Sequence, residues 1–356
     1  MSFYLETQRA GIDWLLNPAS PELGELAREA EARAVDSACD PRGLADDADE
    51  LRRLIRERHF GVATRHVAMP DDELDAWEKR LEARPRTWGE AVTELQHDLR
   101  DALRDQHIRL RGGAPRFEPS LRGQPAVEEQ RIGDTVVLIV RRLWGDSDDD
   151  RLLEAWVARA DEHFAYERIV VDLRGNTGGN DGYTFDWASS CFDAAPTFVR
   201  DWTWCVRGTP VGIWNSATWG EVRDGVAPLH DSRHDPRSGD TLEVVADEEG
   251  LEVGHKPWRG RMVVLVDRRT ASSGESSAWL LRAGLGARVV GEPTLGMIEY
   301  GNVVPYVLPR SGLVIHLPTK RNDFGLPVEG RGFPVDAPLD PETPVEDVVR
   351  DFDLFV

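Results

Sequence analysis

Two neighbouring serines stand where an apolar run gives way to a helical pattern. In "VLVDRRTASSGESSA" (264–278), Ser272 and Ser273 follow the run and precede Gly274. A turn from strand to helix can expose a serine hydroxyl, and the next N–H then lies at a helix N-terminus, where free donors and the dipole favour an anion. Serines also cap helices at such places. The residues alone leave both interpretations open, a nucleophile beside half an oxyanion hole or a helix cap.

A second apolar run ends in a glycine-rich stretch, "VVDLRGNTGGN" (170–180). Glycines leave backbone amides uncovered, so Gly175, Gly178 and Gly179 could approach a ligand closely or form a tight turn. The stretch lacks both the G-K-[ST] ending of a phosphate-binding loop and the G-x-G-x-x-G spacing of a dinucleotide site. It could instead supply a second donor to an oxyanion beside the serines.

Alternating strand and helix patterns surround these two stretches. The segments "DTVVLIV", "RIVVDL" and "RMVVLVD" have the apolar character of buried parallel strands, and helical patterns separate them. This order predicts an α/β core with a parallel sheet. In such sheets, ligands gather beyond the carboxyl ends of the strands, where the glycines and the serines lie. Near the end of the chain, "YVLPRSGLVIHLPTKR" suggests a hairpin that turns at Ser311 and Gly312.

We expect a helical domain over residues 1–110. Its last helix has Thr87 followed three residues later by Glu90, the pattern of a capping box. His59 and His66 are expected to line a cleft from this domain. The remaining divisions are a linker at 111–130, the α/β core at 131–340 with a Trp-rich insertion at 200–258, and a C-terminal tail at 341–356.

Composition excludes several classes of partner. The formal net charge is -21, which disfavours binding to nucleic acid and to anionic membranes.

No apolar stretch has the length of a membrane span, and the first residues do not resemble a signal peptide, so we expect a cytoplasmic protein. Three scattered cysteines indicate reduced thiols. His230 and His234 lack an obvious third ligand, and no metal or organic cofactor is expected.

Four blocks together resemble the tail-specific, or C-terminal processing, serine peptidase family. They are "VVDLRGNTGG", "VLVDRRTASSGESSA", "GARVVGEPTLG" and "VEGRGFPVDAPL", in the family's order and with comparable spacing. The resemblance covers residues 131–340 and a short motif near His107. It implies a core related to the crotonase and Clp-protease folds, preceded here by the N-terminal helical domain. It also implies that Ser272 is the nucleophile and that the N–H groups of Ser273 and Gly178 hold the oxyanion, with Ser273 as the competing nucleophile.

The resemblance also bears on the general base. Many members use a lysine, but Met297 stands at its position, and Lys320 could replace it only from another strand. The branch that includes the tricorn core and the retinoid-binding-protein repeats uses a histidine in a "D-G-H-T-x-L" stretch. "DQHIRL" (105–110) aligns His107 with that base, and Gln106 stands where the tricorn-type enzyme has a serine.

One further residue follows from the same branch. Glu329 matches a glutamate that supports the histidine, directly or through Gln106. A carboxylate near an imidazole fixes its tautomer and stabilises the imidazolium.

These observations predict a serine peptidase that acts on peptides, or on one dedicated peptide or protein, through an acyl-enzyme. Many members carry a PDZ domain, for which residues 111–130 are too few. Two alternatives stay open: an inactive protein that binds peptides or apolar ligands on the same scaffold, and an acyl-transfer enzyme for ligation, cyclisation or ester hydrolysis. The oligomeric state also stays open.

Overall fold

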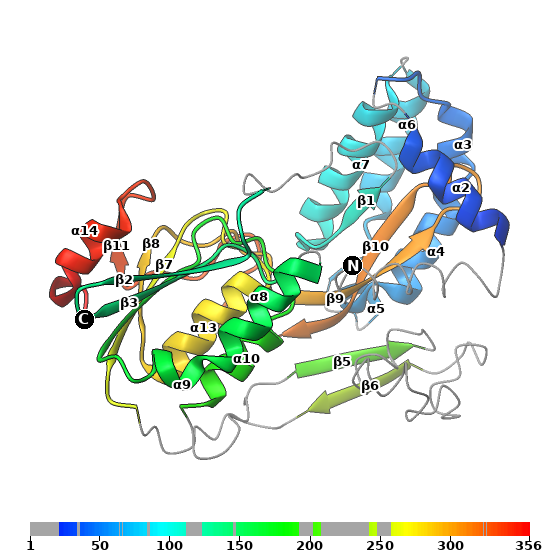
Figure 1. Cartoon of the computed structure of the whole chain (residues 1–356). Helices are drawn as coiled ribbons and strands as arrows, with labels where there is room; N and C mark the ends of the chain where they lie inside the picture. The colour runs from blue at the N-terminus through cyan, green and yellow to red at the C-terminus, as the bar shows by residue number, and fades with distance from the viewer. Residues whose placement is uncertain are drawn as a thin grey trace.

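The fold is that of a computed structural model. It describes residues 21–33, 36–63, 65, 67–83, 86–111, 123–144, 147–191, 202–207, 242–247, 258–322, 324 and 326–356. These residues form an α/β body built on a six-stranded sheet and a helical body that packs on a five-stranded antiparallel sheet (Figure 1). Both the parallel core and the N-terminal helical region predicted from the sequence are present.

The six-stranded sheet has the order β11-β8-β7-β4-β3-β2. All neighbours in it are parallel except β2, which pairs antiparallel with β3. The strands are β2 (Val127–Ile132), β3 (Thr135–Val140), β4 (Arg168–Asp172), β7 (Arg261–Val266), β8 (Arg288–Gly291) and β11 (Ala337–Pro338). The glycine-rich loop follows β4 and the serines follow β7, so the two stretches leave adjacent parallel strands at the same edge of the sheet.

Helices cover both faces of this sheet (Figure 1). One face packs against α8 (Ser147–Ala158), α9 (Ala160–His163), α10 (Gly182–Ser189) and α13 (Ser273–Leu285). The other face packs against α14 (Val345–Arg350) and the short 3-10 helix Phe352–Leu354. Because side chains alternate along a strand, Val170 faces α14 while Ile169 and Val171 face the larger helical layer.

The helical body contains six described helices. They are α2 (Pro21–Ala32), α3 (Pro41–Ala45), α4 (Ala48–Arg58), α5 (Phe60–Ala63), α6 (Asp71–Ala83) and α7 (Trp88–Leu103). The predicted capping box is confirmed: Glu90 N–H donates to Thr87 Oγ1, and Thr87 N–H donates to the Glu90 carboxylate. Leu95, Leu99 and Leu103 of α7 are fully buried in the core of this body.

A hairpin from late in the chain completes the helical body. The five-stranded sheet consists of β1 (Arg109–Arg111), β5 (Trp202–Arg207), β6 (Leu242–Asp247), β9 (Tyr300–Val307) and β10 (Val314–Asn322). Strands β9 and β10 form the hairpin expected around Ser311 and Gly312, and β10 also pairs with β1 and β5. Leu313, Ile315 and Leu317 enter the same core as the early helices.

The structure differs from the predicted divisions in three places. The segment predicted as a linker, 111–130, ends within β2; its residues 112–122 lie outside the described part of the chain. The segment predicted as a tail, 341–356, contains α14, because Val345, Val348 and Phe352 cover an otherwise exposed apolar sheet face. The hairpin of 300–322, predicted within the α/β core, shares its apolar residues with the helical body.

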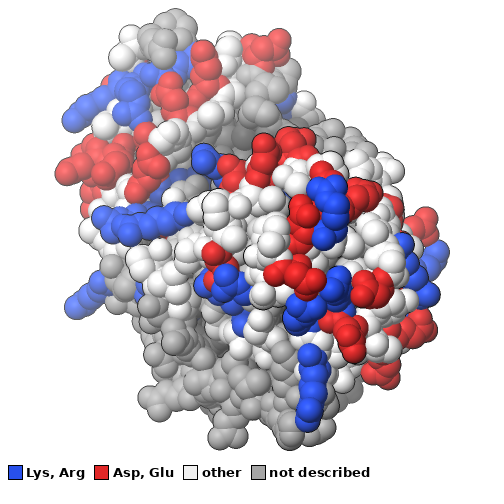
Figure 2. Space-filling view, turned by 90° about the vertical axis from the view of Figure 1, so that its left-hand side faces the viewer, with Lys and Arg blue, Asp and Glu red and all other residues white. Residues whose placement is uncertain are grey.

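Most of the Trp-rich insertion at 200–258 lies outside the described residues, including Trp214, Trp219, His230 and His234. Its described parts are β5 and β6, which pair with each other, and Trp258, which packs in the α/β core. No described helix is long and apolar enough to cross a membrane. Acidic and basic side chains intermingle on the face shown in Figure 2. Ion pairs in the molecule include those of Arg168 and Arg261 with Asp353.

Candidate active site

Ser272 is the last residue before α13 and has an unusual backbone conformation. Its φ of 52° and ψ of -122° lie in a region that L-residues seldom adopt. Its N–H donates to Glu275 Oε2 at 2.9 Å. Glu275 is fully buried and also accepts hydrogen bonds from Thr294 Oγ1, Gly296 N and Met297 N, at 2.5, 2.9 and 2.8 Å. The strained turn is therefore held by a buried carboxylate.

The glycine-rich loop lies directly against this turn. A Cβ on Gly178, whose φ is +97°, would come within 2.8 Å of Ser272 Cβ and 2.9 Å of Ser273 N, so only glycine fits there. Asn176 fastens the loop: its carbonyl oxygen accepts the Ala271 N–H at 2.8 Å, and its side chain donates to Val140 O at 2.8 Å. The two stretches that the sequence places at strand ends thus meet.

The two predicted oxyanion donors differ in their surroundings. The N–H of Ser273 stands in the first turn of α13, where it has no acceptor among the described residues. The N–H of Gly178 donates to Asn176 Oδ1 at 2.8 Å, which differs from the prediction that it is available to an oxyanion. Because the Asn176 side chain already satisfies it, Gly178 can serve as a donor only if it shares or releases this bond.

His107 reaches the serine from the helical body. Helix α7 ends at Leu103, and its C-cap, Arg104, has a left-handed conformation (φ 49°) three residues before His107. His107 is buried, and its Nε2 lies 3.2 Å from Ser272 Oγ, although 165 residues separate the two in the chain. Ser273 Oγ instead donates to the carbonyl oxygen of Gly179 at 2.8 Å.

Two carboxylates lie close to His107. Glu329 Oε1 accepts the backbone N–H of Gln106 at 2.8 Å, while Oε2 accepts the N–H groups of Ile298 and Glu299 at 3.0 and 2.8 Å. Burial and the nearby charge of Asp105 raise the pKa of Glu329 to about 8. Glu329 thus contacts the histidine segment through the backbone N–H of Gln106 and not through the Gln106 side-chain amide.

Asp105 is the other carboxylate, and the sequence motifs did not predict a role for it. It is fully buried, and its Oδ1 accepts the His107 N–H at 2.8 Å and lies 4.0 Å from His107 Nδ1. It stands at the first position of the "D-G-H-T-x-L" pattern, which is the signal that could have identified it. His59, expected to line a cleft, is instead fully buried beside Asp105, and His66 lies outside the described residues.

Asp105, His107 and Glu329 form the cluster among the described residues that could hold a metal ion. One ligand atom from each lies within 4.8 Å of the others. However, Glu329 already accepts three backbone N–H groups, and Asp105 Oδ1 accepts a fourth. Each carboxylate has about four acceptor sites, so three of those on Glu329 are already occupied, whereas Asp105 accepts the His107 N–H and faces His59 Nε2.

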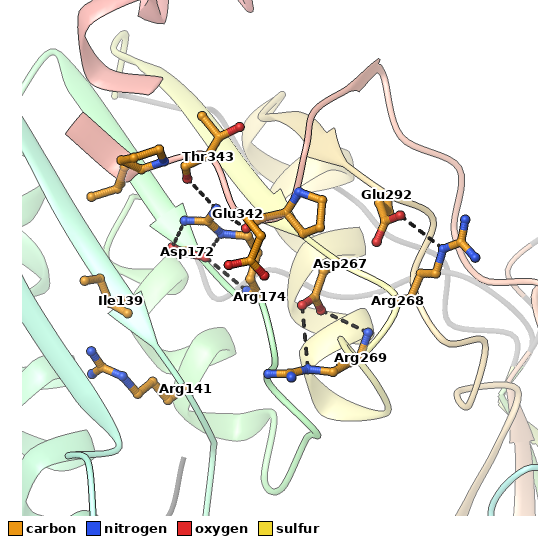
Figure 3. A pocket seen from close by; sticks show the side chains of 13 residues that line it. Ile139, Arg141, Asp172, Arg174, Asp267, Arg268, Arg269, Glu292, Glu342 and Thr343 are labelled. Carbon is orange, nitrogen blue, oxygen red and sulfur yellow. Dashed lines mark hydrogen bonds and ion pairs between the residues drawn. The ribbon is translucent and has the colours of Figure 1, made fainter. Parts of the chain in front are cut away.

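A separate cavity of about 530 Å³ opens at the same sheet edge, and none of the predicted site residues lines it (Figure 3). Arg174 forms an ion pair with Asp172 at 2.6 Å and donates to Pro341 O and Thr343 O. The other arginines that line the cavity also pair with carboxylates: Arg141 with Glu128, Arg268 with Glu292 and Arg269 with Asp267. The cavity thus offers no arginine without a counter-ion.

The sequence matches one known protein family. The family model described as Peptidase family S41 matches residues 146–323, half of the 356 residues. The matched range contains the glycine-rich loop and both serines. No curated protein matches the sequence.

Several solved structures have a similar fold. A candidate peptidase from Parabacteroides merdae has a TM-score of 0.51 and 15% identity, covering 88% of this chain and 93% of that one. A lipoprotein from Streptococcus agalactiae has a TM-score of 0.49 and 13% identity, covering 87% and 96%. The tricorn protease has a TM-score of 0.40 and 14% identity, covering 85% and 34%. Because the sequence identity is only 15%, the similarity to the Parabacteroides protein shows a shared fold and no shared activity.

Proposed function

Since the chain belongs to peptidase family S41, we propose that it is a serine peptidase that cleaves peptide bonds through an acyl-enzyme on Ser272. The observation that carries the proposal is the 3.2 Å separation between His107 Nε2 and Ser272 Oγ. At this distance the imidazole can take the hydroxyl proton as the oxygen attacks a peptide carbonyl. His107 then returns the proton to the leaving amine, and water releases the acyl group by the same steps.

Two contacts favour Ser272 over its neighbour as the nucleophile. Ser272 Oγ faces the imidazole, whereas Ser273 Oγ donates to a backbone carbonyl oxygen. The strained conformation of Ser272 also resembles that of a nucleophile at a sharp turn from strand to helix. Ser273 would contribute its backbone N–H.

The oxyanion would lie at the N-terminus of α13. The N–H of Ser273 and the dipole of this helix of 13 residues favour negative charge there. The second donor would come from the glycine-rich loop, either from Gly178 after it leaves Asn176 or from Gly179. Glu329 would orient the His107 segment through the backbone N–H of Gln106, and the charge of Asp105 would stabilise the imidazolium that forms on His107.

Labelling with a fluorophosphonate probe, followed by peptide mapping, tests this proposal. Wild type is expected to be modified at Ser272, and Ser272→Ala to lose the adduct. We expect His107→Ala to slow labelling by about 10⁴-fold, since no other group replaces the base. Ser273→Ala is the matched control and should keep the Ser272 adduct, because the variant retains its backbone N–H.

A folded wild type without an adduct, or an adduct on Ser273, would contradict the assignment. If Ser272 is labelled, a peptide library read by mass spectrometry separates hydrolysis from transfer of the acyl group to another amine. Cleaved peptides support the peptidase; ligated or cyclised products favour an acyl-transfer enzyme. Binding of peptides without labelling favours an inactive binding protein on this scaffold.

A further inference from the structure

His59 is a fully buried histidine that the proposed mechanism does not use. It follows the last residue of α4 and precedes α5, and it lies 46 residues before Asp105 in the chain. Its side chain has 0% exposure. A buried polar ring in this position needs partners for both of its nitrogens.

The partners of His59 determine which nitrogen carries the proton. The backbone N–H of Val62 donates to His59 Nδ1 at 3.3 Å, so Nδ1 acts as an acceptor. In the neutral ring the proton is then on Nε2, which lies 3.2 Å from Asp105 Oδ2. His59 is therefore placed to donate to Asp105 while its other nitrogen is occupied, and it is not placed to act as a base.

Asp105 connects this donor to the proposed base. Its Oδ2 faces His59, whereas its Oδ1 accepts the backbone N–H of His107 and lies 4.0 Å from His107 Nδ1. The opposite nitrogen of His107 faces Ser272. The Asp105 carboxylate thus lies between the imidazoles of His59 and His107, and only that of His107 reaches Ser272.

The packing around His59 restricts its ring. The ring of Tyr300 lies 5.4 Å from it, centroid to centroid, with 50° between the planes. A Cβ on Gly61 would come within 2.7 Å of Tyr300 Oη and 3.2 Å of His59 Cε1, so no larger residue fits beside the pair. Because the ring has little room to turn, the direction of its Nε2–H toward Asp105 is defined by the fold.

We propose that His59 is a positioning residue for the peptidase reaction: its Nε2–H holds Asp105 so that the carboxylate faces His107 Nδ1. The negative charge of Asp105, 4.0 Å from Nδ1 and beyond hydrogen-bond distance, favours the proton of neutral His107 on Nδ1 and leaves Nε2 to accept the proton of Ser272. The inference rests on the proposed function, because it assigns His59 an effect on the same base. It adds a residue from the helical body whose effect passes entirely through Asp105.

The test compares second-order rates of fluorophosphonate labelling and, once a substrate is found, kcat and KM. His59→Leu is expected to slow labelling and lower kcat by about 10- to 100-fold with KM nearly unchanged, the usual effect of losing a group that orients an active residue. His59→Gln, which keeps an N–H donor, should recover part of the rate. In an Asp105→Asn background, His59→Leu should cause little further loss, because both changes act on one interaction.

The matched control is His163, a second buried histidine far from the serine in the chain. Its Nε2 lies 3.2 Å from Glu129 Oε2 and its Nδ1 accepts from Trp187 Nε1 at 3.0 Å, so its pattern of partners resembles that of His59. His163→Leu should lower stability while leaving the labelling rate near that of wild type. Equal slowing in both leucine variants would indicate general destabilisation and overturn the inference.

Nitrogen-15 NMR of the imidazole rings gives a readout that needs no activity. The wild-type spectrum should show His59 with its proton on Nε2, and His107 with its proton on Nδ1. A His59 proton on Nδ1 would overturn the inference, and this spectrum decides the matter if both His59 variants fail to fold. If the wild-type protein is not labelled at all, the result counts against the proposed function. If the wild type is labelled and the folded His59→Leu variant is labelled equally fast, the result counts only against the role of His59.

Discussion

Ser272 lies beside His107 and has a backbone conformation that costs free energy. A non-glycine residue in a sparsely populated region costs of order 1–3 kcal/mol and persists only where its surroundings determine it. Here the buried Glu275 holds the Ser272 N–H, and Gly178 leaves no room for the turn to relax toward the glycine-rich loop. Ser272 Oγ lies 3.2 Å from His107 Nε2, while Ser272 and Glu275 also form a capping box at the start of α13, so both interpretations of the serine find a contact here.

Glu329 should make the stability of the protein depend on pH. Its pKa of about 8 in the folded state exceeds the value of about 4.3 for an unfolded chain, so between these limits the folded state holds more protons. The free energy of unfolding therefore falls as pH rises, by at most about 1.4 kcal/mol per pH unit from this group. We expect Glu329→Gln to remove this part of the slope, measured by urea denaturation at several pH values between about 5 and 8.

The exposed Glu346 on α14 provides the control for this measurement. Glu346→Gln should keep the wild-type slope, because its carboxyl group stays in water in both states. A Glu329→Gln variant with an unchanged slope would show that Glu329 is already ionised in the folded protein across this range.

At the scale of elements, the N-terminus of α13 is tied to the segment after β8 by one side chain. Burial raises the pKa of Glu275, while the hydrogen bonds from Thr294, Met297, Gly296 and Ser272 act in the opposite direction. Four donors from two segments converge on this carboxylate, so it sets the position of the serine relative to residues 294–297.

Replacing Glu275 should therefore destabilise the fold strongly. Glu275→Ala leaves buried donors without an acceptor, and we expect it to lower the free energy of unfolding by about 3–5 kcal/mol. Urea denaturation measures this, with the exposed Glu82→Ala on α6 as a control that should change stability by less than about 0.5 kcal/mol. If Glu275→Ala costs less than about 1 kcal/mol, the carboxylate does not organise the turn; Glu275→Gln serves if the alanine variant does not fold.

At the scale of the whole molecule, the two bodies are joined by segments distant in the chain. The turn of the β9–β10 hairpin is held by Asp47, which accepts the N–H groups of Arg310 and Ser311 at 2.9 and 2.7 Å. The hairpin begins just after Met297 and Ile298, which contact the carboxylates of the site. The helical body that carries His107 is thus built partly from the chain that follows Ser272, which constrains the distance between these two side chains.

The last residues of the chain should contribute directly to stability. Phe352 is fully buried against the sheet face that α14 covers, whereas Leu354, two residues later, is 82% exposed. We expect Phe352→Ala to lower the free energy of unfolding by about 3–5 kcal/mol and Leu354→Ala to change it by less than about 0.5 kcal/mol. Urea denaturation compares the two, and similar values for both would mean that these residues are a dispensable tail.

Local patterns were sufficient for much of the fold. The capping box at Thr87 and Glu90, the apolar strands and the hairpin turn at Ser311 and Gly312 depend on residues a few positions apart, so sequence alone identifies them. The order of strands and helices likewise places the glycine-rich loop and the serines at one sheet edge, and the resemblance of the motifs to a peptidase family supplied His107 and Glu329 as candidates.

Tertiary structure decided which groups meet and how. No local signal marks His59, because its partner Asp105 is 46 residues away and a buried histidine in a helical region usually serves packing. The occupied N–H of Gly178 depends on the side-chain orientation of Asn176, and the cover supplied by residues 341–356 depends on an apolar sheet face formed by four earlier strands. The 3.2 Å approach of His107 to Ser272 spans 165 residues, so it arises only when the two bodies pack together.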